Sequence, residues 1–205
     1  MLIYSSDKLQ KDLHHELIKK IALGNEEALT EVYHHFAEKV YNTAISYLKN
    51  IEEAEEVTQD VFFEVYKSAK HFKFESSLST WIYKLTVNKS LDTLRKRKAK
   101  KRFGIVFSIF SKPNEESNVG PTDFHHPGAS LEQQEDSTIL FKAIDQLNHN
   151  QKTAFILSQI EGLKHKEIAN ILDVTPKAVE SLIGRSKQKL REILEKDFPN
   201  RGKSK

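Results

Sequence analysis

Two segments of the chain are dense in cations that could bind the phosphates of a nucleic acid. Between Lys84 and Arg102 there are nine basic residues and one acidic residue, a net charge of +8. Gly162–Lys205 carries eleven basic and six acidic residues, a net charge of +5. The whole chain has a net charge of only +3, so its cations are segregated. Such segments are typical of contact with a phosphate backbone; the alternative is a solvated helix face.

Acidic residues concentrate between Glu52 and Glu64, where six carboxylates occur and no cation. Glu52 and Glu56 can share one helix face, so a carboxylate-based, metal-dependent hydrolase is a remote alternative. No H-E-x-x-H motif, nucleophile constellation or glycine-rich phosphate loop accompanies them. Adjacent histidines such as His34 and His35 do not share a helix face. The sequence therefore predicts that the chain is not an enzyme, with no catalytic residue, no metal and no cofactor.

The segment Lys164–Arg185 has the pattern of a helix-turn-helix. Its apolar residues occupy the inward positions of two short helices, and the small Ala169 stands where these helices cross. Thr175 is a good N-cap, and Pro176 falls at the first helical position, where its missing N–H costs nothing. Asp173 stands in the turn, where glycine is usual, and aspartate tolerates the left-handed conformation better than most residues. The alternative is a generic helical hairpin.

The second helix of this motif would lie in a major groove, with its N-terminal residues towards the base edges. Lys177 is suited to guanine acceptors, Glu180 can accept from cytosine N4, and later cations suit phosphates. The predicted DNA-contacting residues are Lys166, Thr175, Lys177, Ala178, Glu180, Ser181, Arg185 and Lys187. A helix-turn-helix regulator that binds duplex DNA without any other protein is the main alternative function.

Apolar periodicity indicates that the elements that carry these residues are helices. The chain has 205 residues with only 7 glycines and 5 prolines, too few for the many tight turns of a β-sandwich or barrel. We expect an all-α fold: two small helical domains joined by a flexible linker. The expected ranges are a helical domain over 1–102, a linker over 103–137, a helix-turn-helix domain over 138–197 and a disordered tail over 198–205. The apolar residues that follow Phe103 are unusual for a linker and either extend the preceding helix or dock elsewhere.

The cysteine count and the hydropathy pattern bear on the compartment. The chain has no cysteine, which fits a reducing environment. No stretch approaches 18 uninterrupted apolar residues, and the N-terminus lacks the apolar core of a signal peptide. We therefore expect a cytoplasmic protein without membrane insertion.

Two segments of the N-terminal domain carry a resemblance to a known family. Glu53–Phe62 (EAEEVTQDVF) is similar to the polymerase-clamp-binding helix of bacterial sigma factors, and Phe74–Tyr83 (FESSLSTWIY) looks like their promoter-melting loop and helix. Glu161-Gly162-Leu163, before Glu167-Ile168-Ala169, is similar to their fourth region. With both lobes in this order, the chain resembles the small extracytoplasmic-function (ECF) group. The fold implied is a region 2-like domain, a linker and a region 4-like domain.

The resemblance implies an initiation factor that binds core RNA polymerase, melts the minus-ten element and reads the minus-thirty-five element. The implied partners are core polymerase, promoter DNA as duplex and as melted single strand, and an anti-sigma factor. The implied clamp-binding residues are Glu56, Gln59, Asp60 and Phe63. The implied minus-ten residues are Phe72, Lys73, Phe74, Ser76, Asn88, Asp92, Arg95 and Lys96.

Three residues of this segment have two interpretations. Asp92 and Arg95 lie one turn apart, either as part of a polar strip against DNA or as an intrahelical ion pair. Trp81 lies on an apolar stripe and is expected in the core, with stacking on a base as the alternative.

The chain departs from the family pattern at Glu180 and Leu182 of the helix-turn-helix, where basic residues are frequent. These departures affect the promoter bases that are read.

Overall fold

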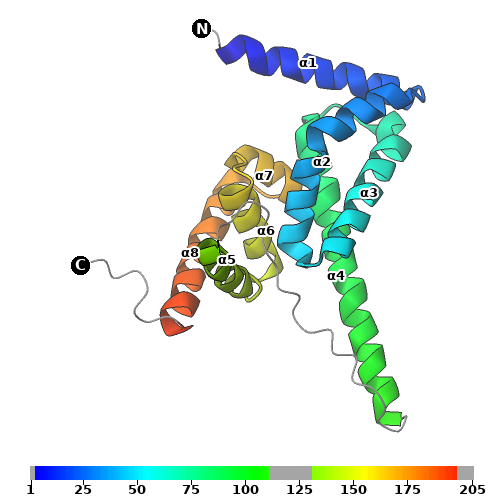
Figure 1. Ribbon diagram of the computed structural model, residues 1–205. Coiled ribbons are helices and arrows are strands. Elements are labelled where there is room, and N and C mark those ends of the chain that lie inside the picture. The colour runs from blue at the N-terminus through cyan, green and yellow to red at the C-terminus, as the bar shows by residue number, and fades with distance from the viewer. Residues whose placement is uncertain (1–2, 111–130, 198–205) are drawn as a thin grey trace. The chain divides into compact units, whose positions relative to one another are not determined.

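Helices make up both parts of the chain whose structure is described, and these parts contain no strand. The structure is a computed structural model that describes the backbone of residues 3–110 and 131–197 and the side chains of residues 12–102 and 137–196. The chain divides into two units, Met1–Thr122 and Asp123–Lys205, and the division falls inside the predicted linker. The predicted tail, 198–205, lies outside the described residues. The all-α prediction is confirmed (Figure 1).

The first unit contains α1 (Ile3–Ala22), α2 (Glu26–Leu48), α3 (Ile51–Ser68), the short η1 (Ala69–His71) and α4 (Leu78–Phe110). Asparagine side chains cap the starts of α2 and α3. Asn25 Oδ1 accepts the backbone N–H of Ala28, and Asn50 Oδ1 accepts that of Glu53, both at 2.7 Å. These bonds satisfy amide donors that a helix leaves without partners at its first turn. The predicted cap at Asn25 is confirmed.

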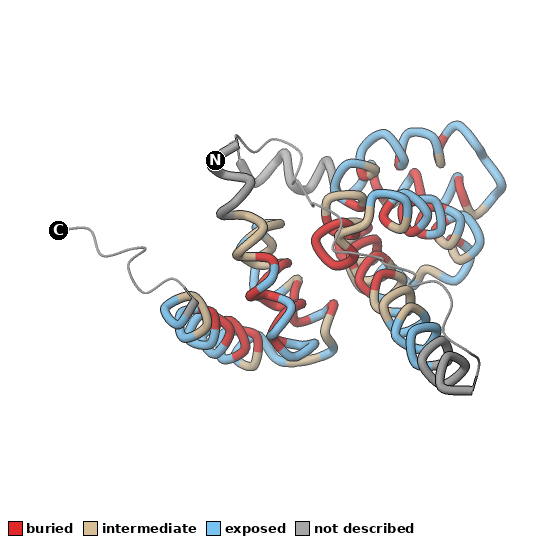
Figure 2. The backbone as a smooth tube through the Cα atoms, turned by 60° about the horizontal axis from the view of Figure 1, so that its bottom comes forward, coloured by how far each residue is buried: buried red, intermediate tan, exposed pale blue. Residues whose placement is uncertain are grey.

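The core of the first unit lies between α2, α3 and α4, with α1 packed on α2 and η1. Each of these helices buries one apolar face, as Figure 2 shows by the alternation of buried and exposed residues along them. The most buried large side chains include Ile18, Ile21, Ile45, Tyr47, Leu48, Leu78 and Ile82. This arrangement leaves the outer faces of α3 and α4 to carry polar residues.

Helix α4 continues past Arg102 into the range expected for the linker. It continues to Phe110, so residues 103–110 extend the helix, which is one of the two expected alternatives. Gly104 costs about 1 kcal/mol in a helix interior, but no proline interrupts residues 78–110 and the preceding Arg, Lys and Ala residues favour helix. Helix α5 (Leu131–Ile144) likewise begins inside the predicted linker, among helix-favouring Glu and Gln residues.

The second unit contains α5, α6 (His149–Phe155), a π-helical turn η2 (Ile156–Ile160), α7 (His165–Leu172) and α8 (Pro176–Asp197). Asn148 and Gln151 form a capping box that starts α6. The buried Ser186 hydroxyl on α8 lies 2.7 Å from the backbone oxygen of Leu182 and 3.1 Å from that of Gln151, so α8 contacts α6 here. The two helices of the predicted helix-turn-helix therefore rest on a core that α6 completes.

No helix in the described ranges is long and apolar enough to cross a membrane.

Candidate nucleic-acid interface

The predicted clamp-binding residues share one exposed side of α3. Glu56, Gln59 and Asp60 are exposed, and Phe63 is an apolar side chain with 65% of its surface exposed. Their spacing keeps them on neighbouring positions of the helix surface, while Val57, Val61 and Val65 are buried on the opposite side. A surface that joins carboxylates to an exposed aromatic ring is suited to a basic protein partner.

The predicted minus-ten loop contains aromatic rings that contact one another and Trp81. The Phe72 ring lies 4.6 Å from the Trp81 ring, with an interplanar angle of 32°, and 4.9 Å from the Phe74 ring. Ser77 Oγ accepts the backbone N–H of Thr80 at 3.1 Å at the start of α4, so the loop enters the helix in a fixed direction. Lys73 is exposed and Ser76 is half-buried in the same loop.

Trp81 does not lie in the core, contrary to the expectation from its apolar stripe. It is half-buried, because the Phe72 ring from the loop covers it in place of a neighbouring helix. The sequence carried no signal for this contact, since the loop has no periodicity that would direct Phe72 towards α4.

The predicted polar strip on α4 is exposed at Asn88, Asp92, Arg95 and Lys96. Within it, Arg95 Nη1 donates to Asp92 Oδ1 at 2.7 Å, so the intrahelical pair forms. Both side chains are largely exposed, and such a pair stabilises a helix by only about 0.3–0.5 kcal/mol. The pair can therefore open at little cost when a phosphate competes for the guanidinium.

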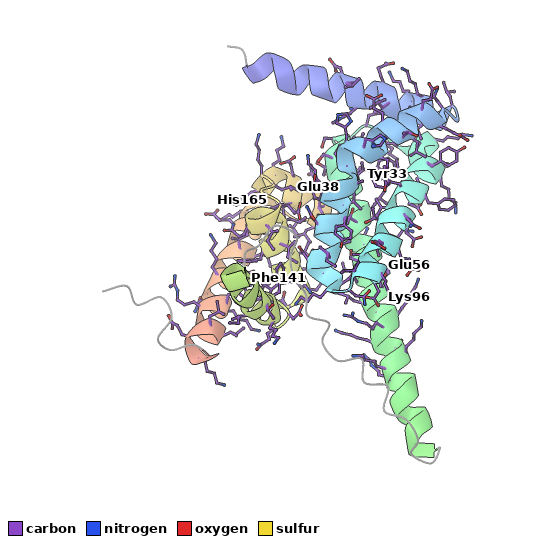
Figure 3. The ribbon with its side chains drawn as sticks, viewed as in Figure 1. Tyr33, Glu38, Glu56, Lys96, Phe141 and His165 are labelled. Atoms are coloured by element: carbon purple, nitrogen blue, oxygen red, sulfur yellow. The ribbon has the colours of Figure 1, made fainter. Side chains whose placement is uncertain are left out.

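Two other cations of this basic segment are held by carboxylates of α3. Arg97 Nη1 donates to Glu53 Oε2 and to the backbone oxygen of Leu48, both at 3.2 Å. Lys89 Nζ lies 3.3 Å from Glu64 Oε2. The Ser68 hydroxyl, which donates to Glu64 at 2.7 Å, and Lys89 lower the pKa of this carboxyl. These ion pairs join the acidic helix to the basic one, and sequence spacing gave no signal for them. Figure 3 labels Glu56 on α3 and Lys96 on α4, the two helices that these ion pairs join.

The helix-turn-helix has the geometry that its sequence predicts. Thr175 Oγ1 accepts the backbone N–H of Ala178 at 3.2 Å, and α8 begins at Pro176. Asp173 adopts the left-handed conformation, with φ of 54°. The backbone N–H groups of Asp173 and Val174 both donate to the Ala169 oxygen, which closes the turn.

One side of α8 presents the predicted base-reading residues to solvent. Lys177, Glu180 and Ser181 are exposed in its first turns, while Val179, Leu182, Ile183 and Ser186 are buried. Arg185 and Lys187 are exposed further along α8, Lys166 is exposed on α7 and Ala178 is half-buried. Leu182, one of the departures from the family pattern, is 9% exposed and faces the core, so it is a packing residue.

Within the ranges whose side chains are described, no group of three or more His, Asp or Glu residues is arranged to hold a metal ion.

Comparisons with known proteins agree with this arrangement of two units. The family described as Sigma-70 region 2 matches residues 32–100, and the family described as Sigma-70, region 4 matches residues 137–190. The ECF RNA polymerase sigma factor SigW of Bacillus subtilis is 25% identical over 177 residues, which cover 86% of this chain and 94% of the relative. The ECF RNA polymerase sigma-E factor of Haemophilus influenzae is 28% identical over 174 residues, with 84% and 90% covered.

Solved structures show the same fold. CnrH, solved with the cytosolic domain of CnrY, aligns with a TM-score of 0.65 at 19% identity, over 90% of this chain and 99% of that chain. The sigma factor RpoE of Bartonella quintana, solved with the anti-sigma factor NepR, aligns with a TM-score of 0.59 at 22% identity, over 82% of this chain and 97% of that chain.

Proposed function

We propose which step of transcription initiation each of the two units performs. The chain belongs to the extracytoplasmic-function (ECF) group of bacterial RNA polymerase sigma factors. As a sigma factor of this group, it binds core RNA polymerase and directs promoter-specific transcription initiation. The observation that carries this conclusion is that both sigma regions match in order, one in each helical unit. Each unit also exposes charged residues beside its core.

In this proposal the exposed side of α3 docks on core polymerase. Gln59 and Asp60 stand at its centre, with Glu56 and Phe63 beside them. A carboxylate surface with one exposed ring supports docking on basic helices, because complementary charge sets orientation and association rate while the ring contributes buried area.

The minus-ten element is melted by the loop and the polar strip of the first unit. Phe72 and Phe74 supply stacking surfaces for an unpaired base, and each base–aromatic stack contributes about 1–3 kcal/mol. Asn88, Arg95 and Lys96 on the exposed side of α4 then contact the melted strand. Arg97 and Lys89 are not assigned to this role, because both are ion-paired with carboxylates of α3.

The second unit reads the minus-thirty-five element as duplex. Lys177, Glu180 and Ser181 reach base edges from the first turns of α8, while Arg185, Lys187 and Lys166 contact phosphates. Thr175 and Ala178 complete the contact surface at the N-terminus of the helix. Because the cations of α8 contact phosphates, this part of the binding weakens as salt rises.

The chain performs no reaction of its own in this proposal, since the polymerase supplies the chemistry of RNA synthesis. It acts in the cytoplasm, where core enzyme and promoter are found. An anti-sigma factor is proposed as a further partner, since the Bartonella quintana relative was solved bound to one.

The docking surface is tested with the double variant Gln59→Ala, Asp60→Ala. We expect affinity for core polymerase to fall about tenfold, equivalent to ~1.4 kcal/mol, with an unchanged circular dichroism spectrum. Glu55→Ala is the matched control, because it removes one charge from another exposed position of α3. If the double variant and the wild type bind core polymerase with equal affinity, this side of α3 is not the docking surface.

The reading helix is tested with Lys177→Ala and Glu180→Ala. Each is expected to change the preferred minus-thirty-five sequence in a promoter-selection experiment with holoenzyme, since a base contact is worth about 1–3 kcal/mol of discrimination. Lys189→Ala, an exposed cation further along α8, is the control and is expected to weaken binding evenly across sequences. Unaltered preference in both reading variants would reject these two residues as readers.

A further inference from the structure

Helix α1 lies before the segment that matches the sigma family, yet it is firmly attached to the first unit. Leu17, Ile18 and Ile21 are almost completely buried. His14 is buried as well, with its ring 5.4 Å from the ring of Phe36 on α2. The family model of Sigma-70 region 2 begins only at residue 32, so it does not include α1.

One residue of α1 contacts the minus-ten loop directly. The His15 ring meets the Phe74 ring edge to face, with centroids 4.9 Å apart and an interplanar angle of 79°. Phe74 contacts Phe72 at 4.9 Å, and Phe72 contacts Trp81 at 4.6 Å. Four rings from α1, the loop and α4 therefore form one continuous cluster, with His15 at one end.

The backbone of Phe74 shows why this cluster matters. Its φ is 58°, in the left-handed region, which costs roughly 1–2 kcal/mol for a residue with a Cβ atom. A bulky residue remains there only when its surroundings hold it. Phe74 lies between His15 and Phe72, while 37% of its surface stays exposed. The ring is thus contacted by two neighbouring rings and still partly open to a ligand.

We propose that His15 is a positioning residue for promoter melting, which holds the Phe74 ring in place to receive an unpaired base of the minus-ten element. The proposal rests on the role proposed above for Phe74. His15 acts through the Phe74 ring and makes no base contact of its own. Removal of its ring lets the loop leave the left-handed conformation, so the holoenzyme must reorganise the loop each time it captures the strand.

The test uses His15→Ala in holoenzyme with a single-stranded oligonucleotide that carries the minus-ten element of a promoter this protein transcribes. We expect affinity for this strand to fall about two- to tenfold, the range of an aromatic pair, with affinity for core polymerase unchanged. His15→Phe keeps an edge-to-face ring and is expected to restore binding. Lys19→Ala, an exposed position on α1, is the control and is expected to change neither affinity.

A spectroscopic signature separates positioning from general stability. Trp81 is the only tryptophan of the chain, and it belongs to the ring cluster. Its fluorescence in the folded protein is expected to change in His15→Ala and to stay constant in Lys19→Ala. Strand affinity that falls together with core affinity and with the melting temperature would overturn the proposal, because His15 would then only stabilise the fold.

Phe74→Ala distinguishes failure of this inference from failure of the proposed function. If Phe74→Ala weakens strand binding and His15→Ala does not, the positioning role of His15 is overturned and the role of Phe74 stands. If Phe74→Ala leaves strand binding unchanged, the role of Phe74 fails and the inference fails with it. Failure of His15→Phe to restore binding would also overturn the inference, since the ring would not be the cause.

Discussion

The two units each have a non-glycine residue in the left-handed conformation shortly before a helix that is predicted to contact DNA. Phe74 precedes α4 with φ of 58°, and Asp173 precedes α8 with φ of 54°. Asp173 is held locally, because two backbone N–H groups of the turn donate to the Ala169 oxygen. Phe74 is held by rings that belong to α1 and to the loop itself.

The same contrast extends to the cations of the two DNA-facing helices. On α4, Arg97 and Lys89 are bound to carboxylates of α3. On α8, Lys177 and Lys187 are exposed and form no ion pair within the described part of the chain. In the first unit, contacts with distant elements hold the loop before the DNA-facing helix and the cations on it, whereas in the second unit the turn before α8 is held by local hydrogen bonds. The four predictions that follow test this difference.

The largest expected effect comes from Phe74→Gly. Glycine accepts the left-handed conformation, so this change relieves the backbone and removes only the ring. We expect holoenzyme affinity for the melted minus-ten strand to fall about tenfold or more, from the loss of a stack worth about 1–3 kcal/mol. Fluorescence anisotropy with a labelled strand measures it, and undiminished affinity would show that the ring is not part of the binding surface.

The next effect comes from Arg97→Met, which breaks the bridge between α3 and α4. Its ion pair is partly exposed, so most of the expected loss of about 1 kcal/mol in unfolding free energy comes from the hydrogen bond to Leu48. Urea unfolding followed by Trp81 fluorescence measures this loss. Lys98→Met, at an exposed neighbouring position, is the control. An equal loss in both variants would mean that the bridge has no special part in holding α4.

A smaller effect, of opposite sign, is expected from Asp173→Gly. Relief of the left-handed strain should raise the unfolding free energy by up to about 1 kcal/mol, as followed by circular dichroism. Affinity for minus-thirty-five duplex should not change, because the exposed side of α8 is untouched. Asp173→Ala keeps the strain and should be less stable than Asp173→Gly. A glycine variant less stable than the wild type would contradict the local account of this turn.

The smallest effect is a pH dependence confined to the first unit. Burial lowers the pKa of His14 below 6.5, electrostatic interactions with His35, Lys39 and His15 lower it further, and Glu31 raises it. Because the unfolded chain then binds the proton more readily, stability falls as pH drops through about 6.5 and levels off below the folded pKa.

Urea unfolding at pH 7.5 and pH 5.5, followed by Trp81 fluorescence, measures this dependence. We expect a fraction of the ~1.4 kcal/mol per pH unit that one full proton would give. His14→Gln is expected to reduce the difference between the two pH values. A difference of the same size in that variant would assign the effect to other groups.

The sequence predicted the locally determined parts of this molecule well. The cap at Asn25, the start of α8 at Pro176 and the left-handed Asp173 follow from neighbouring residues alone. The exposure of the predicted site residues on α3 and α8 follows from helical periodicity. Their roles in binding remain predictions.

The parts that the sequence did not predict depend on contacts between distant residues. Trp81 is covered by a loop residue, Arg97 is bound to Glu53, and His15 lies on Phe74. No spacing within one element encodes such contacts. The sequence also left two alternatives for the apolar residues that follow Phe103, and in the structure they extend α4 to Phe110.

The central claim is that this chain is the specificity subunit that turns core polymerase into a promoter-selective enzyme. Run-off transcription on genomic fragments, with core RNA polymerase in the presence and absence of the purified chain, tests it most directly. The account predicts discrete transcripts that appear only when the chain is present and that weaken in Phe74→Gly. The absence of any chain-dependent transcript across the genome would contradict it.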